Sequence, residues 1–293
     1  MTIDPKLFAL AGAICFGLGP ILVKFGFARA GRVDGAVMVA LAIAIPLYLG
    51  LLPWVGGLHW DEMTPEAFVG FALGGLFGGG IGRRWMYIAI DRIGASPATA
   101  IKNAAPLFTT AAAVVLFQEP VTLVHWLATV AIVAGITLVT WRRGKGFNLL
   151  DPGVLAAIFS ALSYAVRPLV VKFGLEDASL PVTASLIGAS TGLVYAVIMA
   201  RPWRLSAADL PGRGTLRDPA LPPFLGSGIL QAFGILFITS ALAGGDVSVV
   251  YPITASAPLF TVAFTWLFLR GTELVTWRTL AGAAAVVLGV ILL

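Results

Sequence analysis

The chain has 293 residues, of which 59% are hydrophobic and only 11% are charged. Soluble domains carry about a quarter charged residues, so this composition excludes an ordinary soluble domain and, for the same reason, a disordered chain. The net charge of +5 comes mostly from Lys and Arg residues that flank apolar runs, where they orient membrane helices, so we expect no nucleic-acid partner.

Apolar runs bounded by charged residues or by proline and glycine clusters predict ten membrane-spanning helices. In chain order they cover residues 7–27, 34–52, 66–90, 96–117, 121–141, 152–173, 180–200, 222–243, 247–269 and 274–293. Each is close to the ~20 residues that cross a bilayer. The run 7–27 is about twice as long as the apolar core of a signal peptide, so we expect it to remain as the first span. The sequence predicts an all-α membrane protein of ten transmembrane helices.

The two halves of the chain repeat each other. Three matching features occur in the same order in both halves: GPILVKFG at 19–26 with RPLVVKFG at 167–174, APLFT at 105–109 with APLFT at 257–261, and Glu119 followed by Gly135 with Glu273 followed by Gly289. Internal repetition of this kind indicates a duplicated structural unit. We predict two homologous five-helix units, residues 1–148 and 149–293.

Because five is an odd number, the second unit starts on the opposite side of the membrane. Two such inverted repeats are the architecture of many secondary transporters, which bind their substrate near the midplane between the repeats. About eleven Lys and Arg residues fall in the loops of one face, and Lys6 stands alone on the other. Loops rich in Lys and Arg stay cytoplasmic, so the charges predict a cytoplasmic linker around Arg143 and external termini.

The paired five-helix units, the proline-bearing APLFT helices and the Glu before the last helix of each unit resemble the drug/metabolite transporter superfamily. Within it, the chain is similar to the ten-helix EamA-type exporters, including the YddG-like amino-acid exporters. The resemblance covers essentially the whole chain. It implies an inner-membrane exporter of small metabolites, with a central cavity lined by the first, third, fourth, sixth, eighth and ninth helices. Members of that family are commonly drawn with cytoplasmic termini, whereas the charges of this chain predict the reverse.

The sequence carries no pattern typical of an enzyme or a metal site. Its two histidines, His59 and His125, lie in a loop and near a helix end, and Cys15 is its one cysteine. Metalloprotease, hydrolase and phosphate-loop motifs are missing, as is any pair of carboxylates inside a span. We expect no enzyme activity, no cofactor and no metal, and a monomer whose partners are membrane lipid and a small-molecule substrate.

Four glycines and four prolines inside the predicted spans are informative. Gly70, Gly74, Gly78 and Gly82 fall four residues apart and form a stripe that lets another helix approach closely, either for tight packing or as a seam along which helices slide. Pro20, Pro106, Pro168 and Pro258 occupy equivalent positions of the two halves. A proline inside a helix frees the carbonyl four residues before it, here those of Phe16, Lys102, Tyr164 and Thr254. Interrupted segments at matching positions indicate a transporter site; static kinks satisfied by a neighbour are the alternative.

Charged residues inside the spans are the next candidates. Lys24 and Lys172 lie within a turn of their helix ends and are expected to extend to the interface. Four cations lie deeper: Arg83, Arg84, Lys102 and Arg167. The carboxylates fall at span ends, within reach of bulk water: Asp34, Asp91, Glu119, Asp151, Asp246 and Glu273. Unpaired cations suit a substrate carboxylate or phosphate, and contact with backbone carbonyls near the interface is the alternative.

Helical spacing arranges the polar side chains in stripes, which normally face a wet interior in a membrane bundle. The substrate-binding residues predicted from these stripes are Arg83, Tyr87, Lys102, Asn103, Ser163, Tyr164, Arg167, Gln231, Tyr251 and Ser256. An aromatic lining from Phe16, Trp85, Tyr164 and Phe237 would favour aromatic or hydrophobic substrates, unless these rings pack in the core.

The sequence therefore predicts an exporter of small metabolites, most consistent with amino acids, that works by alternating access. Because no carboxylate is embedded in a span to carry a proton, uniport or exchange is expected; Lys102 is the one embedded group that offers a route to proton coupling. Two alternatives stay open: a flippase for lipids or lipid-linked sugars, which the basic residues would also suit, and a non-transporting membrane receptor or intramembrane enzyme.

Overall fold

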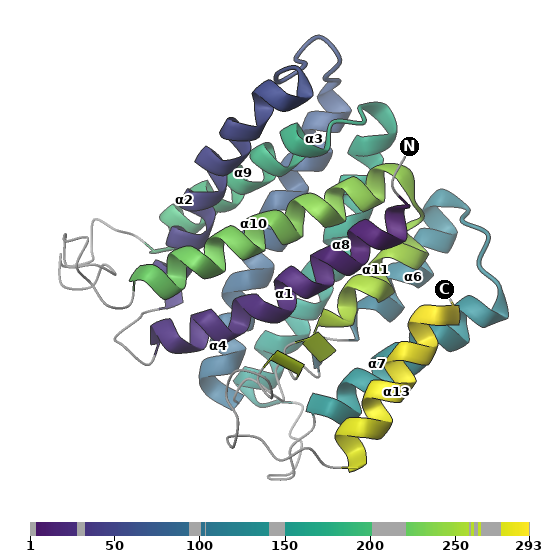
Figure 1. Ribbon diagram of the computed structural model, residues 1–293. Helices are drawn as coiled ribbons and strands as arrows, with labels where there is room; N and C mark the ends of the chain where they lie inside the picture. Colours follow the sequence, from purple (N-terminus) through teal and green to yellow (C-terminus); the bar gives the residue numbers. More distant parts are fainter. Residues whose placement is uncertain are drawn as a thin grey trace.

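The computed structural model describes residues 4–27, 33–93, 101–102, 104–140, 150–200, 221–257, 259–260, 263–264 and 277–292. Within them the chain is helical in ten successive regions (Figure 1). The first half contains α1 (Pro5–Phe27), α2 (Val33–Leu51) with the short turn η1 (Leu52–Val55), the consecutive segments α3 (Pro65–Gly74), η2 (Gly75–Gly82) and α4 (Arg83–Ile93), then residues 101–102 with α6 (Ala105–Phe117), and α7 (Leu123–Thr140). The second contains α8 (Pro152–Asp177), α9 (Pro181–Ala200), α10 (Leu221–Gly244), α11 (Val247–Ala255) and α13 (Trp277–Leu292).

The all-α, ten-helix prediction is confirmed, and most predicted boundaries agree to within four residues where the ends are described; the exceptions are the interrupted fourth and ninth spans, in which α6 begins at Ala105 and α11 ends at Ala255. Local chemistry explains where several of the helices start. Several helices start at a proline, whose fixed φ suits the first turn. Two of those starts also have a side-chain cap: the Thr64 hydroxyl accepts from the Ala67 amide at 3.0 Å, and the Asp151 carboxylate accepts from the Gly153 amide at 2.7 Å.

The helices pack in matched pairs, as a repeated unit requires. In Figure 1, α1 runs along α10. In the other half of the repeat, α8 is equivalent to α1, and the region of α3 and α4 is equivalent to α10; these too pack against each other. Likewise α2 contacts α10 while α9 contacts α3 and η2. The pairs α2 with α9, α6 with α11 and α7 with α13 each join equivalent helices. The tertiary structure thus repeats the two-fold pattern read in the sequence.

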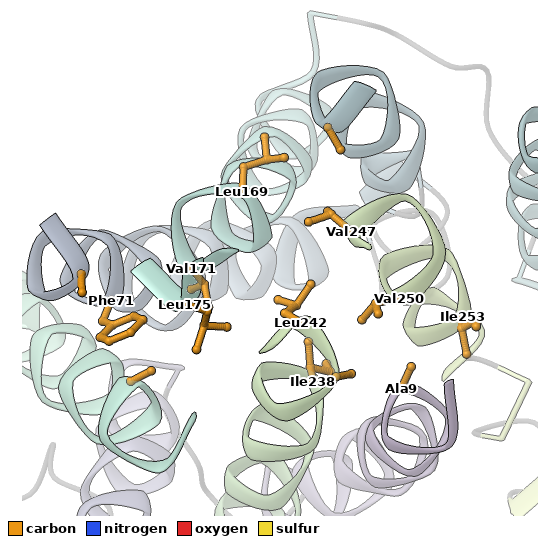
Figure 2. Packing of buried hydrophobic residues seen from close by; sticks show 14 of the residues in the cluster. Ala9, Phe71, Leu169, Val171, Leu175, Ile238, Leu242, Val247, Val250 and Ile253 are labelled. Carbon is orange, nitrogen blue, oxygen red and sulfur yellow. The ribbon is translucent and has the colours of Figure 1, made fainter. Parts of the chain in front are cut away.

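Small residues fill the interior, and large apolar residues cover the outside. Alanines dominate the buried positions, whereas Val115 and Leu123 are 77% and 74% exposed. This arrangement suits a bilayer, where helices associate through close packing of small residues and large side chains face lipid. Figure 2 shows one interior cluster, in which Leu242, Ile238 and Val250 gather between α8 and Ala9 of α1. Within the described residues, four helices are long and apolar enough to cross a membrane, and the chain is a multi-pass membrane protein.

The matched glycines of the last helix in each half lie at the contact between those helices. A Cβ atom on Gly135 of α7 would lie 2.6 Å from the Gly282 carbonyl oxygen of α13. A Cβ atom on Gly289 of α13 would lie 2.6 Å from a side-chain carbon of Ile132 in α7. Neither distance is sterically allowed, so glycine at both sites permits the close approach of α7 and α13.

Two charged residues hold the turn between α10 and α11, and one of them corrects an expectation. The Nζ of Lys172 donates to the carbonyls of Leu242 and Gly245 at the end of α10, each at 3.1 Å. Glu119 is not at a solvated helix end but 7% exposed, and its carboxylate accepts from the amides of Val247 at 2.8 Å and Ser248 at 2.9 Å. A cation thus meets the negative C-terminus of α10, and an anion meets the positive N-terminus of α11.

Candidate functional site

The glycine stripe brings the third helical region against α8. Cβ atoms on Gly70, Gly74, Gly78 and Gly82 would all meet atoms of α8, which confirms the predicted close approach. Between α3 and α4 the chain adopts the wider turns of a π-helix in η2, a conformation that often marks functional sites. At Gly78 the neighbour is the side chain of Arg167 itself. The absence of a side chain at residue 78 therefore makes room for a cation deep in the bundle.

Pro168 frees a carbonyl inside α8, and another helix uses it. The Tyr164 carbonyl, four residues before Pro168, accepts a 2.6 Å hydrogen bond from the Tyr251 hydroxyl of α11. One position further along, the Ala165 carbonyl accepts a 3.1 Å bond from the Thr109 hydroxyl of α6. The kink is thus satisfied by neighbours, and in the process it fixes Tyr251 and α6 beside Tyr164.

The fourth and ninth regions are interrupted at equivalent places. The Ala104 and Leu107 amides donate to the Ile101 and Ala104 carbonyls, each at 3.1 Å. Their counterparts repeat this pattern, with Ser256 to Ile253 at 3.1 Å and Leu259 to Ser256 at 2.9 Å. Pro106 therefore lies in the first turn of α6 rather than in the middle of a continuous helix, which corrects the predicted uninterrupted span. Such paired breaks expose helix ends inside a membrane protein.

Three cations lie around Tyr164, and one of them, Lys102, is next to the first of these breaks. Lys102, immediately before the break, places its Nζ 5.5 Å from the centre of the Tyr164 ring, a cation–π contact. Arg83, the first residue of α4, is only 6% exposed and lies close to Tyr164. Arg167 lies close enough to Arg83 for the two guanidinium groups to repel each other. We call Arg83, Lys102 and Arg167 the cation cluster.

Hydroxyl and amide groups surround the cation cluster. Tyr87 lies near Gln231, whose Nε2 donates to the Ser227 hydroxyl at 2.9 Å. Tyr48 of α2 lies near Arg167 and Arg83, and its hydroxyl donates to the Ala232 carbonyl at 2.7 Å. The sequence analysis missed Tyr48. An isolated Tyr within an otherwise apolar span was the signal that could have identified it.

No Asp or Glu among the described residues forms an ion pair with the cation cluster. The Nη1 atom of Arg83 is buried without a hydrogen-bond partner in the described part of the chain. Lys102 and Arg167 are densely surrounded by protein, yet both are only half-buried. They keep surface that water or a solute can reach.

The remaining predicted residues make other contacts or lie outside the described residues. The Ser256 hydroxyl donates to the Ile253 carbonyl at 2.7 Å, at the end of its own helix. Ser163 is 8% exposed and faces Gly82. Asn103, Pro258 and the side chains of Pro20 and Lys24 lie outside the described residues.

The aromatic residues proposed as a lining mostly pack against other apolar groups. Trp85 pairs with Phe159 at 5.6 Å, and Phe237 pairs with Phe8 at 6.2 Å. Phe16 packs against the interior apolar cluster. Core packing, the alternative given for these rings, accounts for their contacts; Tyr164 alone joins the cation cluster.

Gly78→Ala should move Arg167 and weaken substrate binding by about tenfold, because a small displacement of a positioning group is costly. A Cβ atom at Gly78 would collide with Arg167 Cδ and lie 2.8 Å from its Nε. Gly50→Ala is the control, since nothing lies within 4 Å of a Cβ atom there and both changes raise helix propensity. Equal affinities for the two variants, measured by ligand titration, would show that Gly78 does not position Arg167.

Comparison with known proteins agrees with this architecture. The model of the EamA-like transporter family matches two stretches of the chain, residues 6–141 and 151–293. A Lactiplantibacillus plantarum protein provisionally named a sugar uptake protein is 24% identical over 258 residues, which cover 85% of this chain and 83% of that relative. A solved crystal structure superposes with a TM-score of 0.74 at 16% identity, covering 98% of this chain and 95% of its own, and therefore supports the fold alone. The chain belongs to the EamA-like transporter family.

Proposed function

We propose that this transporter carries small carboxylate-bearing metabolites across the cell's inner membrane by alternating access, in the direction of export. Amino acids are the substrate class that the sequence predicts, and we retain them. The proposed binding residues are the cation cluster of Arg83, Lys102 and Arg167 with Tyr48, Tyr87, Tyr164, Gln231 and Tyr251. Ser163, Ser256 and Asn103 stay in the proposal as predictions from the sequence.

The observation that carries the proposal is the convergence of three cations without a carboxylate among the described residues. A charged side chain inside a membrane bundle costs roughly 3 kcal/mol unless protein or water compensates it. A substrate carboxylate would supply the missing negative charge. The breaks beside Lys102 and Ser256 support alternating access, because discontinuous helices commonly form the substrate site of such transporters.

The test is uptake of the twenty amino acids, one at a time, into proteoliposomes that hold the purified protein. We expect at least one amino acid to equilibrate faster than in protein-free vesicles. Because uniport or exchange is proposed, an imposed pH gradient should not drive accumulation beyond equilibrium. Uphill accumulation that Lys102→Met abolishes would overturn the uncoupled mechanism. No transport of any carboxylate would overturn the function.

The carboxylate of Glu119 does not change the expectation of uncoupled transport, although it is buried. Both of its oxygens already accept hydrogen bonds from the α11 amides of Val247 and Ser248. A proton carrier must exchange its proton for substrate during the cycle, and this carboxylate is occupied by backbone donors instead. We assign Glu119 to holding α11.

Sugars are the second candidate, because the Lactiplantibacillus plantarum relative is provisionally named a sugar uptake protein. The hydroxyl and amide groups of Tyr87, Gln231 and Ser227 could bind sugar hydroxyls. A neutral sugar, however, would leave the cation cluster uncompensated. Glucose added to the uptake panel decides between the two classes, and lipid-linked sugars in the same panel test the flippase alternative. A receptor or intramembrane enzyme would show no uptake at all.

A further inference from the structure

On the basis of the proposed function, the substrate class can be named more closely. We propose that the preferred substrate carries one more negative charge than a neutral amino acid or a monocarboxylate of the same shape: an acidic amino acid, a dicarboxylate or a phosphate ester. The reasons are the net charge of the site, an unused donor on Arg83, the helix end beside the site and the lack, among the described residues, of a carboxylate to accept from an ammonium group.

The first reason is the balance of charge. Arg83 and Arg167 repel each other, and Lys102 adds a third positive charge over the ring of Tyr164. One carboxylate would compensate one of these three charges. The ammonium group of a zwitterion would bring a fourth cation into the same region, where like charges interact strongly because water is scarce. A second anionic group on the substrate removes this imbalance.

The second reason is an unused donor. Arg83 is 6% exposed, and its Nη1 is buried without a partner among the described residues. A guanidinium group presents five N–H donors in a planar fork that matches carboxylate or phosphate oxygens. Buried polar atoms are normally hydrogen-bonded, and a second anionic group on the substrate would supply the missing acceptor.

The third reason is the α6 helix end. Ala104, the residue before α6, supplies no side-chain cap. Ala105 packs in the cluster against which Tyr164 and Tyr251 lie, so this end is next to the Lys102 contact. The N-terminus of a helix carries a partial positive charge. It therefore adds to the positive potential of the three side chains.

The fourth reason concerns acceptors. The Tyr164 and Ala232 carbonyls beside the cation cluster already accept bonds from Tyr251 and Tyr48. No carboxylate among the described residues pairs with the cluster. An amino acid's ammonium group would thus meet neutral oxygens only, while its carboxylate would meet three cations.

The experiment uses pairs of solutes that share a shape and differ by one charge. Binding of glutamate and glutamine, and of succinate and its monoamide succinamate, is measured by calorimetric titration of the full-length protein in detergent. We expect the more anionic member of each pair to bind at least about tenfold more tightly, as one additional charged hydrogen bond predicts. Arg83→Gln should reduce this ratio, and Arg83→Lys should retain most of it.

The outcomes separate the inference from the proposed function. Equal affinity within both pairs would show that a second negative charge is not preferred, and carboxylate transport would be unaffected by that result. Tighter binding of glutamine than of glutamate would overturn it as well. If none of the four solutes binds while glucose does, the proposed function fails together with the inference. Should Arg83→Gln fail to fold, the Arg83→Lys variant and the wild-type ratios still decide the question.

Discussion

Replacing Lys102 or Arg167 with methionine is expected to weaken binding of the carboxylate substrate by roughly ten- to a hundredfold. Each change removes a charged hydrogen-bond donor, and such a bond contributes about 1.5–3 kcal/mol. Methionine keeps much of the apolar stem, so the new side chain at position 167 would still fill the space beside Gly78. The measurement is a ligand titration of each purified variant, with elution volume on size exclusion as the check on folding.

Matched controls are available for both substitutions. Lys6→Met and Arg92→Met remove exposed cations that lie outside the cation cluster, and both should bind like the wild type. Arg167→Lys keeps the charge but loses the planar fork, so an intermediate affinity is expected. Wild-type affinity in both Lys102→Met and Arg167→Met would mean that the cluster does not meet the substrate. Loss of the folded peak would assign these residues to structure instead.

Glu119→Ala is expected to loosen the start of α11 and to destabilise the protein. The substitution leaves the buried amides of Val247 and Ser248 without their acceptor. Losing a charged hydrogen bond costs about 1.5–3 kcal/mol, and more if both amides stay unsatisfied. The expected results are a lower midpoint of thermal unfolding and faster hydrogen exchange in the peptide that contains residues 247 and 248.

Glu176→Ala provides the comparison, because Glu176 is an exposed carboxylate near the end of α8. It should change neither the unfolding midpoint nor the exchange at residues 247 and 248. A Glu119→Gln variant keeps one acceptor oxygen and should fall between Glu119→Ala and the wild type. If exchange at α11 is the same in Glu119→Ala and Glu176→Ala, the carboxylate does not hold the helix end.

The sequence by itself determined the ten spans, because the length of an apolar run and the prolines and caps at its ends are local properties. Thr64 with Pro65 and Asp151 with Pro152 start their helices with no help from distant residues. The repeat was also visible, since equivalent helices must satisfy equivalent neighbours. The four-residue spacing of Gly70 to Gly82 predicted a close approach correctly, because helical periodicity places those residues on one face. It could not say that α8 would be the partner.

Only the tertiary structure decided which polar groups meet. Glu119 bonds to Val247 across 128 residues of chain, Lys172 to Gly245 across 73, and Tyr251 to Tyr164 across 87. Whether such groups pair depends on how far one helix is rotated and shifted against another, which packing sets and no local pattern encodes. The same reason explains why Tyr48 was missed and why Glu119 was expected within reach of bulk water. Charge inside a span marked Arg83, Lys102 and Arg167 individually; their convergence without a carboxylate among the described residues is a property of the folded bundle.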